Sequence, residues 1–592
     1  MCGILGSSFS SLDFTCLQHR GKDNTSILNV NSLTFSHSLH SIVGDVIQPL
    51  ETEQYVFGAN CEIYNWKDLG TGENDAEVLF AYLRDNGLSA LDSVDGVYAF
   101  FLYDKKNQEL ILARDPLGVK PLWYAYSENG LAFASERKAL QHLDGVRELH
   151  PRHTLRYDEG SNRLETQYRG GIEYNEESDI PYEEAVESAA NRLEKAVLKR
   201  VPQQHDTGLL FSGGIDSAII AHILKRNSIP FTAYYGGVEG KNSVPKDEER
   251  AKKIAALLGL DLETNIVSRK TVSKALPDII HTIDDNNFVK ISVAIPLYFA
   301  AQKADEKVIL TGGEAECIFG GHKRHSDTFD LNKDCLSELR RVWYRDLYRD
   351  DTLMMRHGAE LRVPFLDSAL VKHCMSIPGA LKTKSGKKGL LRDIARKLGM
   401  PEEAVNQPKL SAQYGSHAVR TLKSIADGQI NEWLARTHPA HNIRLLSFLS
   451  TGKDSCLATQ RMIDYNYDVV CFGTVHSENP DSYMSHTPKT EHAQNIAQKA
   501  GIPLIERRSE GKKEKELQDY KAIMEEAIST YGVEGVVTGA IRSEYQKQRI
   551  EKLADEVGLK TYAPLWRIDE EQELYELLRR GFDVEIVKVA AY

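Results

Sequence analysis

The sequence lacks any apolar run that approaches the roughly eighteen residues a membrane-spanning helix requires, so no membrane span is expected. It also lacks an excess of positive charge: 73 Lys and Arg stand against 85 Asp and Glu, and the formal net charge is -12. A nucleic-acid-binding protein normally carries a basic face, so this balance argues against direct nucleic-acid binding. No basic residue precedes the short apolar run at the start of the chain, which argues against a signal peptide.

The eight cysteines form no CxxC pair and follow no regular spacing. This scatter excludes a disulfide scaffold and gives no support to a structural zinc site. Hydrophobic residues make up 41% of the chain and charged residues 27%, as in an ordinary soluble globular protein. We therefore expect a reduced, cytoplasmic protein, and the 592 residues are too many for a single core.

The pattern of apolar residues divides the chain into three blocks. Residues 1–170 contain short alternating stretches separated by turn residues, which predicts a β-rich domain. Residues 180–430 alternate helical and strand patterns, which predicts a parallel sheet covered by helices. The same pattern begins again over residues 443–592, so the chain is predicted to hold two related α/β units.

Each α/β block opens with an apolar strand, a loop of small residues and a helix. The first loop is Phe211-Ser212-Gly213-Gly214-Ile215-Asp216-Ser217, and the second is Leu449-Ser450-Thr451-Gly452-Lys453-Asp454-Ser455. Small residues let the backbone approach an anion, and a helix N-terminus offers unpaired N–H groups. Ser and Asp are also ordinary N-cap residues, so one such loop alone is a weak signal. Two loops, each between strand and helix, predict phosphate binding.

Both loops resemble the SGGxDS pyrophosphate loop of the ATP pyrophosphatase superfamily, and neither has Walker A spacing. Enzymes of that superfamily cleave ATP to AMP and pyrophosphate, and the resemblance implies their parallel-sheet fold, that of the adenine nucleotide α-hydrolases, for both blocks.

Residues 180–430 further resemble the asparagine synthetase family. The motifs that carry this resemblance are Pro245-Lys-Asp247, Arg349-Asp-Asp351, Glu360-Leu-Arg-Val-Pro-Phe-Leu-Asp367, Gly386-Lys-Lys388-Gly-Leu-Leu-Arg392 and Gln407-Pro-Lys409. The resemblance implies an ATP site formed by Leu210, Ser212, Gly213, Gly214, Asp216, Ser217, Tyr235, Thr311 and Gly312. It also implies that Lys388 faces the developing phosphate charge, and that Asp216 and Glu316 hold Mg²⁺.

One segment of this block departs from the family pattern. The acidic loop, often SGEGxDExFGG in relatives, reads Thr311-Gly-Gly-Glu-Ala-Glu-Cys-Ile-Phe-Gly-Gly321. Gly313 and Cys317 stand where the pattern has acidic residues, while Glu314 and Glu316 keep negative charge at shifted positions.

The N-terminal block resembles class II glutamine amidotransferases. The motifs are Met1-Cys2-Gly3-Ile4, His19-Arg-Gly-Lys-Asp23, Ala59-Asn-Cys-Glu-Ile-Tyr-Asn65, Asp75-Ala-Glu77, Ala113-Arg-Asp-Pro-Leu-Gly-Val-Lys-Pro121 and Ala134-Ser-Glu136. The resemblance implies a four-layer αββα sandwich. After removal of Met1, the Cys2 thiol would be the nucleophile and its α-amino group the base. Asn60 would supply an oxyanion-hole amide, and Glu62 and Asp75 would help to hold glutamine.

Two substitutions leave the nitrogen source of this block open between glutamine and free ammonia. Leu39 stands where active relatives have an Arg that grips the α-carboxylate of glutamine. Cys61 replaces a glycine of the oxyanion hole, and any positive φ there would carry a side-chain cost.

Residues 443–592 resemble diphthine–ammonia ligase, the enzyme that amidates diphthine on translation elongation factor 2. The motifs are the second loop, Glu478-Asn-Pro-Asp-Ser-Tyr-Met-Ser-His-Thr-Pro488, Gly535-Val-Val-Thr-Gly-Ala-Ile-Arg-Ser-Glu-Tyr-Gln-Lys-Gln-Arg549 and Ala563-Pro-Leu-Trp-Arg567. The implied second ATP site comprises Ser450, Thr451, Gly452, Lys453, Asp454, Ser455, Gly539, Ser543, Gln546 and Arg549. The C-terminal half of that family, with its EGGEYxT element, is not found, so we expect a block without its usual acceptor half.

Three functions remain open from the sequence. The first is an ATP- and Mg²⁺-dependent amide ligase of asparagine-synthetase type, acting on aspartate with nitrogen from glutamine or ammonia. The second is diphthine–ammonia ligase activity in the C-terminal block, with elongation factor 2 as partner. The third is a degenerate nucleotide-binding regulatory protein. Leu39, Gly313 and Cys317 favour the third, while Lys388 and both phosphate loops favour the first two.

Overall fold

The computed structural model describes residues 2–584, except residues 10–11, 174–175, 241–242, 323, 326–327, 329, 409–411, 427–428, 480–483, 485–491 and 513. The chain divides into two compact units, Met1–Trp433 and Leu434–Tyr592, each described here by itself. Lys409 and most of the motif at 478–488 lie outside the described residues.

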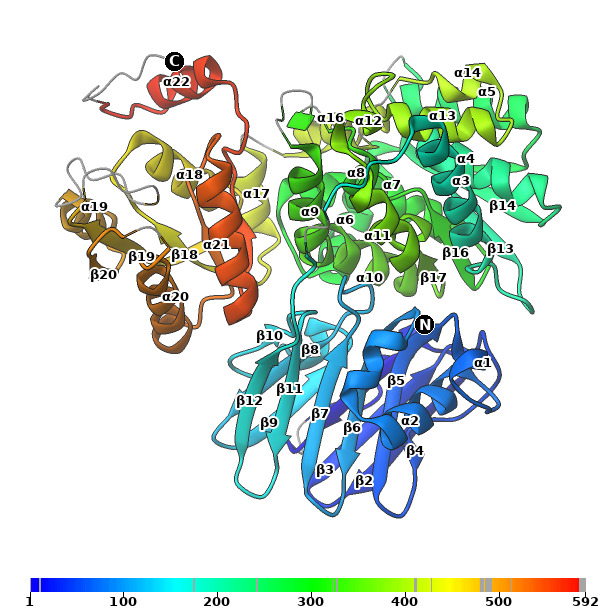
Figure 1. Ribbon diagram of the computed structural model, residues 1–592, viewed down its shortest axis with the longest axis horizontal. Helices are drawn as coiled ribbons and strands as arrows, with labels where there is room; N and C mark the ends of the chain where they lie inside the picture. Colours follow the sequence, from blue (N-terminus) through cyan, green and yellow to red (C-terminus); the bar gives the residue numbers. More distant parts are fainter. Residues whose placement is uncertain are drawn as a thin grey trace. The chain divides into compact units, whose positions relative to one another are not determined.

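The N-terminal part of the first unit is built from two antiparallel six-stranded sheets, whose strand orders are β10-β8-β9-β1-β3-β2 and β12-β11-β7-β6-β5-β4 (Figure 1). The strands are β1 (Gly3–Ser7), β2 (Asn24–Val30), β3 (Leu33–Leu39), β4 (Leu50–Glu51), β5 (Tyr55–Ile63), β6 (Gly96–Asp104), β7 (Glu109–Arg114), β8 (Trp123–Ser127), β9 (Gly130–Ala134), β10 (Arg147–Glu148), β11 (His153–Asp158) and β12 (Arg163–Tyr168). The helices of this part are η1 (Gln18–Arg20), α1 (Trp66–Leu69), α2 (Asp75–Asn86), η2 (Leu88–Ser93) and η3 (Arg137–Leu140).

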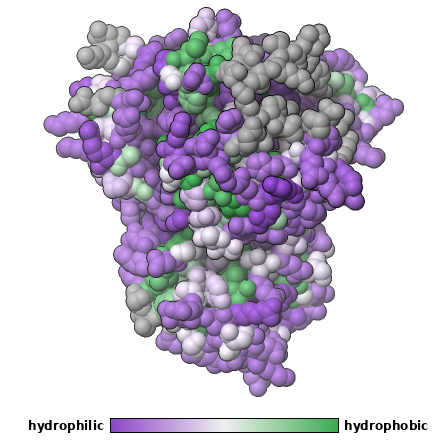
Figure 2. Space-filling model, turned by 90° about the vertical axis from the view of Figure 1, so that its left-hand side faces the viewer, coloured by the Kyte–Doolittle hydropathy of each residue, from purple (hydrophilic) through white to green (hydrophobic). Residues whose placement is uncertain are grey.

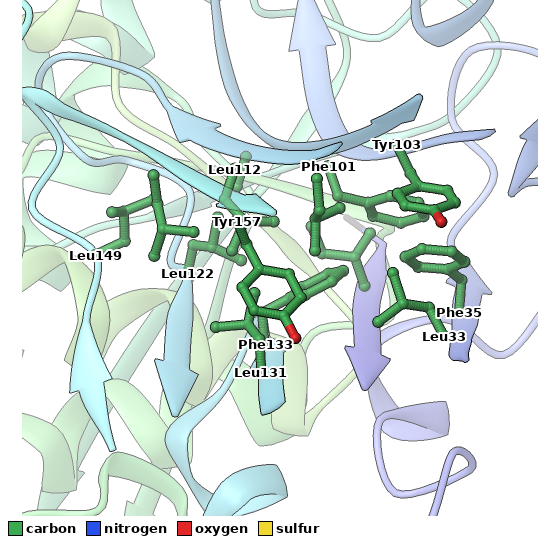
Figure 3. Packing of buried hydrophobic residues seen from close by; sticks show 14 of the residues in the cluster. Leu33, Phe35, Phe101, Tyr103, Leu112, Leu122, Leu131, Phe133, Leu149 and Tyr157 are labelled. Atoms are coloured by element: carbon green, nitrogen blue, oxygen red, sulfur yellow. The ribbon is translucent and has the colours of Figure 1, made fainter. Parts of the chain in front are cut away.

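Strand β6 shows why the two sheets form layers. Its residues are buried on both faces, because successive side chains of a strand point to opposite sides. Phe101 joins the core between the sheets, where its ring stacks on Phe35 of β3 with centroids 4.7 Å apart (Figure 3). Phe100 faces the other way and joins the cluster that contains Phe80 of α2. With η1 and η3 outside the other sheet, the predicted αββα sandwich is confirmed.

The remainder of the first unit is a parallel sheet in the order β15-β14-β13-β16-β17, covered by helices. The strands are β13 (Thr207–Leu210), β14 (Phe231–Val238), β15 (Leu262–Val267), β16 (Val308–Thr311) and β17 (Glu360–Arg362). The helices are α3 (Tyr182–Leu198), α4 (Ile215–Arg226), α5 (Lys246–Leu258), α6 (Arg269–Ile283), α7 (Phe288–Lys303), α8 (Glu316–Phe319), α9 (Leu331–Val342), η5 (Trp343–Leu347), α10 (Tyr348–Arg356), η6 (Pro364–Leu366), α11 (Ser368–Ser376), α12 (Gly379–Lys382), α13 (Gly389–Lys397), α14 (Glu402–Val405), α15 (Ala412–Gly415) and α16 (Ala418–Ile425).

The second unit repeats this topology in the order β20-β19-β18-β21-β22, so the prediction of two related parallel-sheet folds is confirmed. The strands are β18 (Arg444–Phe448), β19 (Asp468–Ser477), β20 (Leu504–Ser509), β21 (Gly535–Val537) and β22 (Lys560–Tyr562). The helices are α18 (Lys453–Asp464), α19 (Ala493–Ala500), α20 (Leu517–Tyr531), α21 (Glu544–Val557) and α22 (Glu570–Arg579). Leu445 and Leu446 point to opposite faces of this sheet, and Leu577 fixes α22 in the cluster on the Leu445 side.

The strand order of both sheets places a ligand site at their centre. The chain runs outward from β13 in one direction through β14, and later from β16 in the other. The loops that follow β13 and β16 therefore diverge at the carboxyl ends of adjacent strands, where open α/β sheets bind ligands. Strands β18 and β21 form the equivalent point in the second unit.

The outer surface is mainly hydrophilic on the face drawn in Figure 2, with apolar residues in small separate patches. Within the described ranges, no helix combines the length and the apolar character needed to cross a membrane.

Candidate active sites

The first phosphate loop links β13 to α4, and hydrogen bonds of the Ser217 hydroxyl stabilise its backbone. Ser212 N–H donates to Ser217 Oγ at 3.3 Å, and Ser217 Oγ donates to the Gly214 carbonyl at 3.2 Å. Gly213 has φ +69°, and a Cβ there would lie 2.8 Å from Ala251 Cα, so only glycine fits. Helix α4 starts after Gly214 without a side-chain cap, which leaves its first N–H groups available to an anion.

The loop after β16 closes on this structure at Gly312. A Cβ on Gly312 would lie 2.6 Å from the backbone of Asp216 and Ser217, so the two loops touch through their main chains. The predicted residues Leu210 and Thr311 end the two adjacent strands that carry these loops. Tyr235 lies on β14 with its hydroxyl buried and without a hydrogen-bond partner among the described residues.

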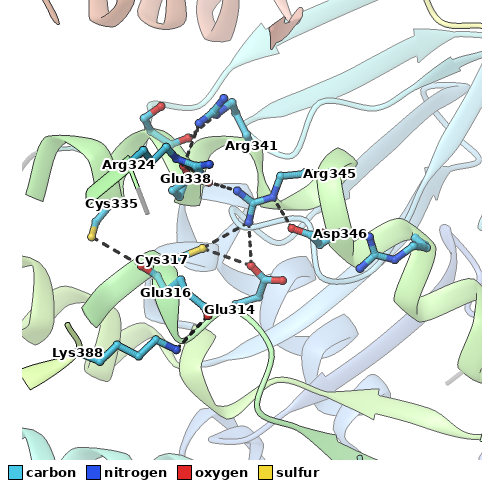
Figure 4. Close-up of polar contacts among 12 residues, drawn as sticks. Glu314, Glu316, Cys317, Arg324, Cys335, Glu338, Arg341, Arg345, Asp346 and Lys388 are labelled. Atoms are coloured by element: carbon cyan, nitrogen blue, oxygen red, sulfur yellow. Dashed lines mark hydrogen bonds and ion pairs between the residues drawn. The ribbon is translucent and has the colours of Figure 1, made fainter. Parts of the chain in front are cut away.

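Lys388 joins the loop to two carboxylates. Its Nζ donates to both carboxylate oxygens of Asp216 at 2.6 Å. It also donates to Glu316 Oε1 at 3.0 Å (Figure 4). Burial alone lowers the pKa of Lys388, but the two adjacent carboxylates outweigh burial and raise that pKa above its ordinary value. The structure thus brings a permanent ammonium group and two acids from α4, α8 and the start of α13 to one point beside the phosphate loop.

The acidic loop beside this point has a left-handed backbone conformation at Glu314. Glu314 adopts φ +69°, a conformation that favours glycine and that costs other residues about 1 kcal/mol or more. Its carboxylate accepts hydrogen bonds from Cys317 Sγ at 3.3 Å and from Arg345 Nη2 at 3.2 Å (Figure 4). Arg345 projects from a π-helical turn, η5, of a kind frequent at functional sites. Sequence reasoning missed Arg345, because no motif marks it.

Burial is the main reason why the pKa of Glu314 rises from 4.5 to about 8, and nearby Asp346 adds to the rise while Arg345 opposes it. Between these two pH values the folded chain holds a proton that the unfolded chain has lost, so stability falls as pH rises. Glu314→Gln cannot ionise, and we expect its unfolding midpoint in denaturant to fall less than the parent's between pH 5 and pH 8. Exposed Glu403→Gln serves as the matched control. Equal pH dependence in all three proteins would contradict the assignment.

The Cys2 site brings the residue that precedes β1 together with Asn60 of β5. The Cys2 nitrogen donates to Asn60 Oδ1 at 3.2 Å, while Asn60 Nδ2 is buried without a hydrogen-bond partner among the described residues. An unpartnered buried amide beside the thiol fits the predicted oxyanion role. Burial raises the pKa of the Cys2 thiol above its ordinary value, so the thiol needs a base.

The cavity beside Cys2 is small and acidic. It encloses about 30 Å³, and among its described lining residues there is no Lys or Arg. Its acidic walls come from Glu62, Asp75 and Glu360, and Leu39 lies on the wall where an Arg was expected. Burial raises the pKa of Glu62 to about 7 and that of Asp75 to about 6. Its described lining residues offer no cation to receive the α-carboxylate of glutamine.

The second departure in this site, Cys61, carries no backbone strain. It lies in the antiparallel strand β5 opposite Tyr98 and is absent from the residues with positive φ. The side-chain cost that a positive φ would have imposed therefore does not arise. Its Sγ instead lies 3.8 Å from Asp75 Oδ2.

Several motif residues tie the N-terminal sandwich to the parallel sheet of the same unit. Arg20 is fully buried, and its Nη1 contacts Glu136 Oε1 at 2.7 Å and Asp351 Oδ2 at 2.9 Å. Arg20 Nε also donates to the Cys2 carbonyl at 3.2 Å. Three motifs from distant parts of the sequence thus form one ion cluster, which positions Cys2.

A second buried network links the same two parts at the Cys2 cavity. Lys120 Nζ lies 3.2 Å from Glu360 Oε2, and Arg362 contacts both Glu360 and Glu62 at 2.7 Å. The sequence motifs contain these residues, but nothing in the motifs showed that they meet.

The second phosphate loop has the geometry of the first. Ser450 N–H donates to Ser455 Oγ at 3.2 Å, and Ser455 Oγ donates to the Gly452 carbonyl at 3.0 Å. A Cβ on Gly539 would lie 2.7 Å from Ser455 N, just as a Cβ on Gly312 would lie 2.6 Å from Ser217 N in the first site. Thr451 takes φ +61° where the first loop has Gly213, which is a strained conformation for a β-branched residue.

A cavity of about 370 Å³ opens beside this loop. The predicted residues that line it are Ser450, Lys453, Asp454, Ser455, Gly539, Ser543 and Gln546. Predicted Arg549 lies instead over the Tyr545 ring and pairs with Glu514, with its Nε 2.9 Å from that carboxylate. The apolar part of the wall includes Phe448 and Tyr520, so the cavity combines an apolar surface with a phosphate loop.

Comparisons with known proteins agree with this geometry. The chain matches a family model described as a glutamine amidotransferase domain over residues 1–158 and one for asparagine synthase over 188–335 and 328–446. A model described as the diphthamide synthase N-terminal domain matches residues 443–561.

Among individual proteins, one of Methanocaldococcus jannaschii assigned as a glutamine-hydrolysing asparagine synthetase is 31% identical, over 73% of this chain and 98% of its own. The asparagine synthetase of Gallus gallus is 27% identical, over 73% of this chain and 89% of its own. A solved glutamine PRPP amidotransferase from B. subtilis aligns at 15% identity and TM-score 0.25, over 70% of this chain and 95% of that one. The sequence relatives carry the assignment: the chain belongs to the family of glutamine-hydrolysing asparagine synthetases, which are ATP-dependent carbon–nitrogen ligases.

Proposed function

We propose that the chain amidates aspartate at the first phosphate loop. A carboxylate oxygen of aspartate attacks the α-phosphorus of ATP, the bond to the bridging oxygen breaks, and pyrophosphate leaves. Ammonia then attacks the acyl carbon, loses a proton and displaces AMP. The observation that carries this proposal is the position of Lys388 between Asp216 and Glu316, directly beside the loop.

Each part of the site has a role in this reaction. The N–H groups at the start of α4 would hold the departing pyrophosphate. Lys388 would neutralise the charge that develops at phosphorus, where a fixed cation is most effective. Asp216 and Glu316 would hold Mg²⁺, since this ion binds through one or two carboxylates together with substrate phosphates. The bound ion would supply further neutralisation of the phosphate charge.

ATP–pyrophosphate exchange tests the acceptor. With purified full-length protein, we expect aspartate to stimulate exchange, and glutamate to give no stimulation above the rate without an amino acid. Exchange with neither acid would overturn the proposal. If glutamate stimulated exchange and aspartate did not, the adenylating site would stand but its acceptor would be glutamate.

We infer that free ammonia is the better nitrogen donor, because the described residues that line the Cys2 cavity include no Lys or Arg. Loss of a charge-assisted contact to a carboxylate costs about 1.5–3 kcal/mol, or roughly 10–100-fold in affinity. Ammonium is therefore expected to support amide formation at least about tenfold faster than glutamine at equal low concentration. Equal rates, together with loss of the glutamine-dependent rate in Cys2→Ala, would contradict this inference.

A second candidate function belongs to the second unit, and the cavity of about 370 Å³ beside its loop favours it. There ATP would activate a carboxylate on a protein, as the likeness to the diphthamide synthase N-terminal domain suggests. Exchange assayed with diphthine-bearing elongation factor 2 tests this candidate, and no stimulation would exclude it. Since all eight cysteines are free thiols, we place both reactions in the reducing cytoplasm.

A further inference from the structure

We propose that Glu573, on α22, completes a divalent-cation site with Asp454, so that the second unit binds its nucleotide as a metal complex. This inference rests on the proposal that the second loop binds ATP. These two carboxylates would hold the cation, which would supply positive charge to the phosphates of the nucleotide.

The contacts around Lys453 carry the inference. Lys453 Nζ lies 2.5 Å from Asp454 Oδ1 and 2.8 Å from Glu573 Oε2. The Glu573 side chain is fully buried, and its other oxygen, Oε1, has no hydrogen-bond partner within the described part of the chain. A buried carboxylate oxygen without a partner is costly, and such a group often marks the place of an ion or ligand.

The first site of the same chain shows the same arrangement. There an ammonium group, that of Lys388, lies between Asp216 and Glu316. Asp216 and Asp454 are each the second residue of the helix that follows a phosphate loop. In both sites the partner glutamate comes from a later segment of the chain.

The lysine and the glutamate of the two sites come from different parts of the fold. Lys453 belongs to the loop itself, whereas Lys388 precedes α13 by one residue. Glu573 lies 120 residues after Lys453, on α22. The shared geometry is therefore reached by unrelated residues, which is why no sequence repeat predicted Glu573.

The charges explain how a cation would enter. Without nucleotide, the Lys453 ammonium group contacts both carboxylates. A triphosphate in the loop would draw the Lys453 ammonium toward its own oxygens. The buried Glu573 carboxylate and the partly exposed Asp454 carboxylate would then face each other without a cation, and hard oxygen ligands of this number suit Mg²⁺ bound together with phosphates.

Counting bound metal and bound nucleotide on the full chain tests this inference. Mn²⁺ is titrated in the presence of a saturating non-hydrolysable ATP analogue and followed by electron paramagnetic resonance, while equilibrium dialysis counts the nucleotide. The parent is expected to bind two nucleotides and two ions per chain. Glu573→Gln is expected to weaken one Mn²⁺ site at least tenfold, and Asp454→Asn, on a different element, to do the same. Exposed Glu571→Gln, on the same helix, is the matched control and should keep both ions.

The outcomes are distinct. Two nucleotides with two undiminished Mn²⁺ sites in both variants would show that Glu573 only fixes α22 to the loop, and would overturn the inference. A parent that binds one nucleotide per chain would refute the nucleotide site of the second unit, and the cation site with it. Loss of the ion in Glu573→Gln alone would also count against the shared site.

Discussion

Lys388→Met is expected to lower ATP–pyrophosphate exchange by about 10²–10³-fold, the usual effect of removing one group that stabilises developing charge. The substitution keeps the length of the side chain but leaves Asp216 and Glu316 facing the phosphates without the ammonium group that now separates them. The loss should appear mainly in kcat, because the charge at phosphorus is greatest in the transition state.

The neighbouring Lys387 is exposed and offers a matched control. Lys387→Met should exchange at the rate of the parent, and circular dichroism should show that both variants are folded. Exchange by Lys388→Met within about threefold of the parent would remove Lys388 from the catalytic site.

Arg20→Met is expected to destabilise the first unit by about 3–5 kcal/mol, the usual cost of removing one member of a buried ion pair. Arg20 is fully buried and faces Glu136 and Asp351, so its loss would leave two carboxylates with less compensation. The midpoint of denaturant unfolding, read with an unchanged slope, measures this effect.

Arg84 provides the comparison, since it pairs with Asp85 on the exposed surface. Arg84→Met should leave the midpoint where it is in the parent, because exposed pairs contribute little. A midpoint for Arg20→Met equal to that of Arg84→Met would mean that the buried cluster does not stabilise the unit.

The sequence predicted those features that depend on neighbouring residues. A strand, a loop of small residues and a helix follow one another within about a dozen positions, so both phosphate loops could be recognised from local chemistry. The short alternating stretches of residues 1–170 likewise predicted a β-rich domain. The parallel-sheet topology followed from the regular exchange of strand and helix.

Contacts between distant residues could not be predicted in this way. Arg20 meets Asp351 across 331 positions, and Lys453 meets Glu573 across 120. The left-handed backbone of Glu314 depends on the loop around it, and its residue type gives no indication of that conformation. The volume of the cavity beside Cys2 is also a property of tertiary packing, which the motifs around Cys2 do not specify.

The ions buried between the N-terminal sandwich and the parallel sheet restrict how the head could be exchanged during evolution. Arg20, Lys120 and Glu62 each have an oppositely charged partner in the other part. If the N-terminal sandwich were replaced by that of another protein, the partner residues of the parallel-sheet part would be buried without an opposite charge. The replacement would have to supply the same charges at the same places. The amidotransferase head and the ligase are thus matched in charge, and selection on the ligase alone would act to retain the charged residues of the head.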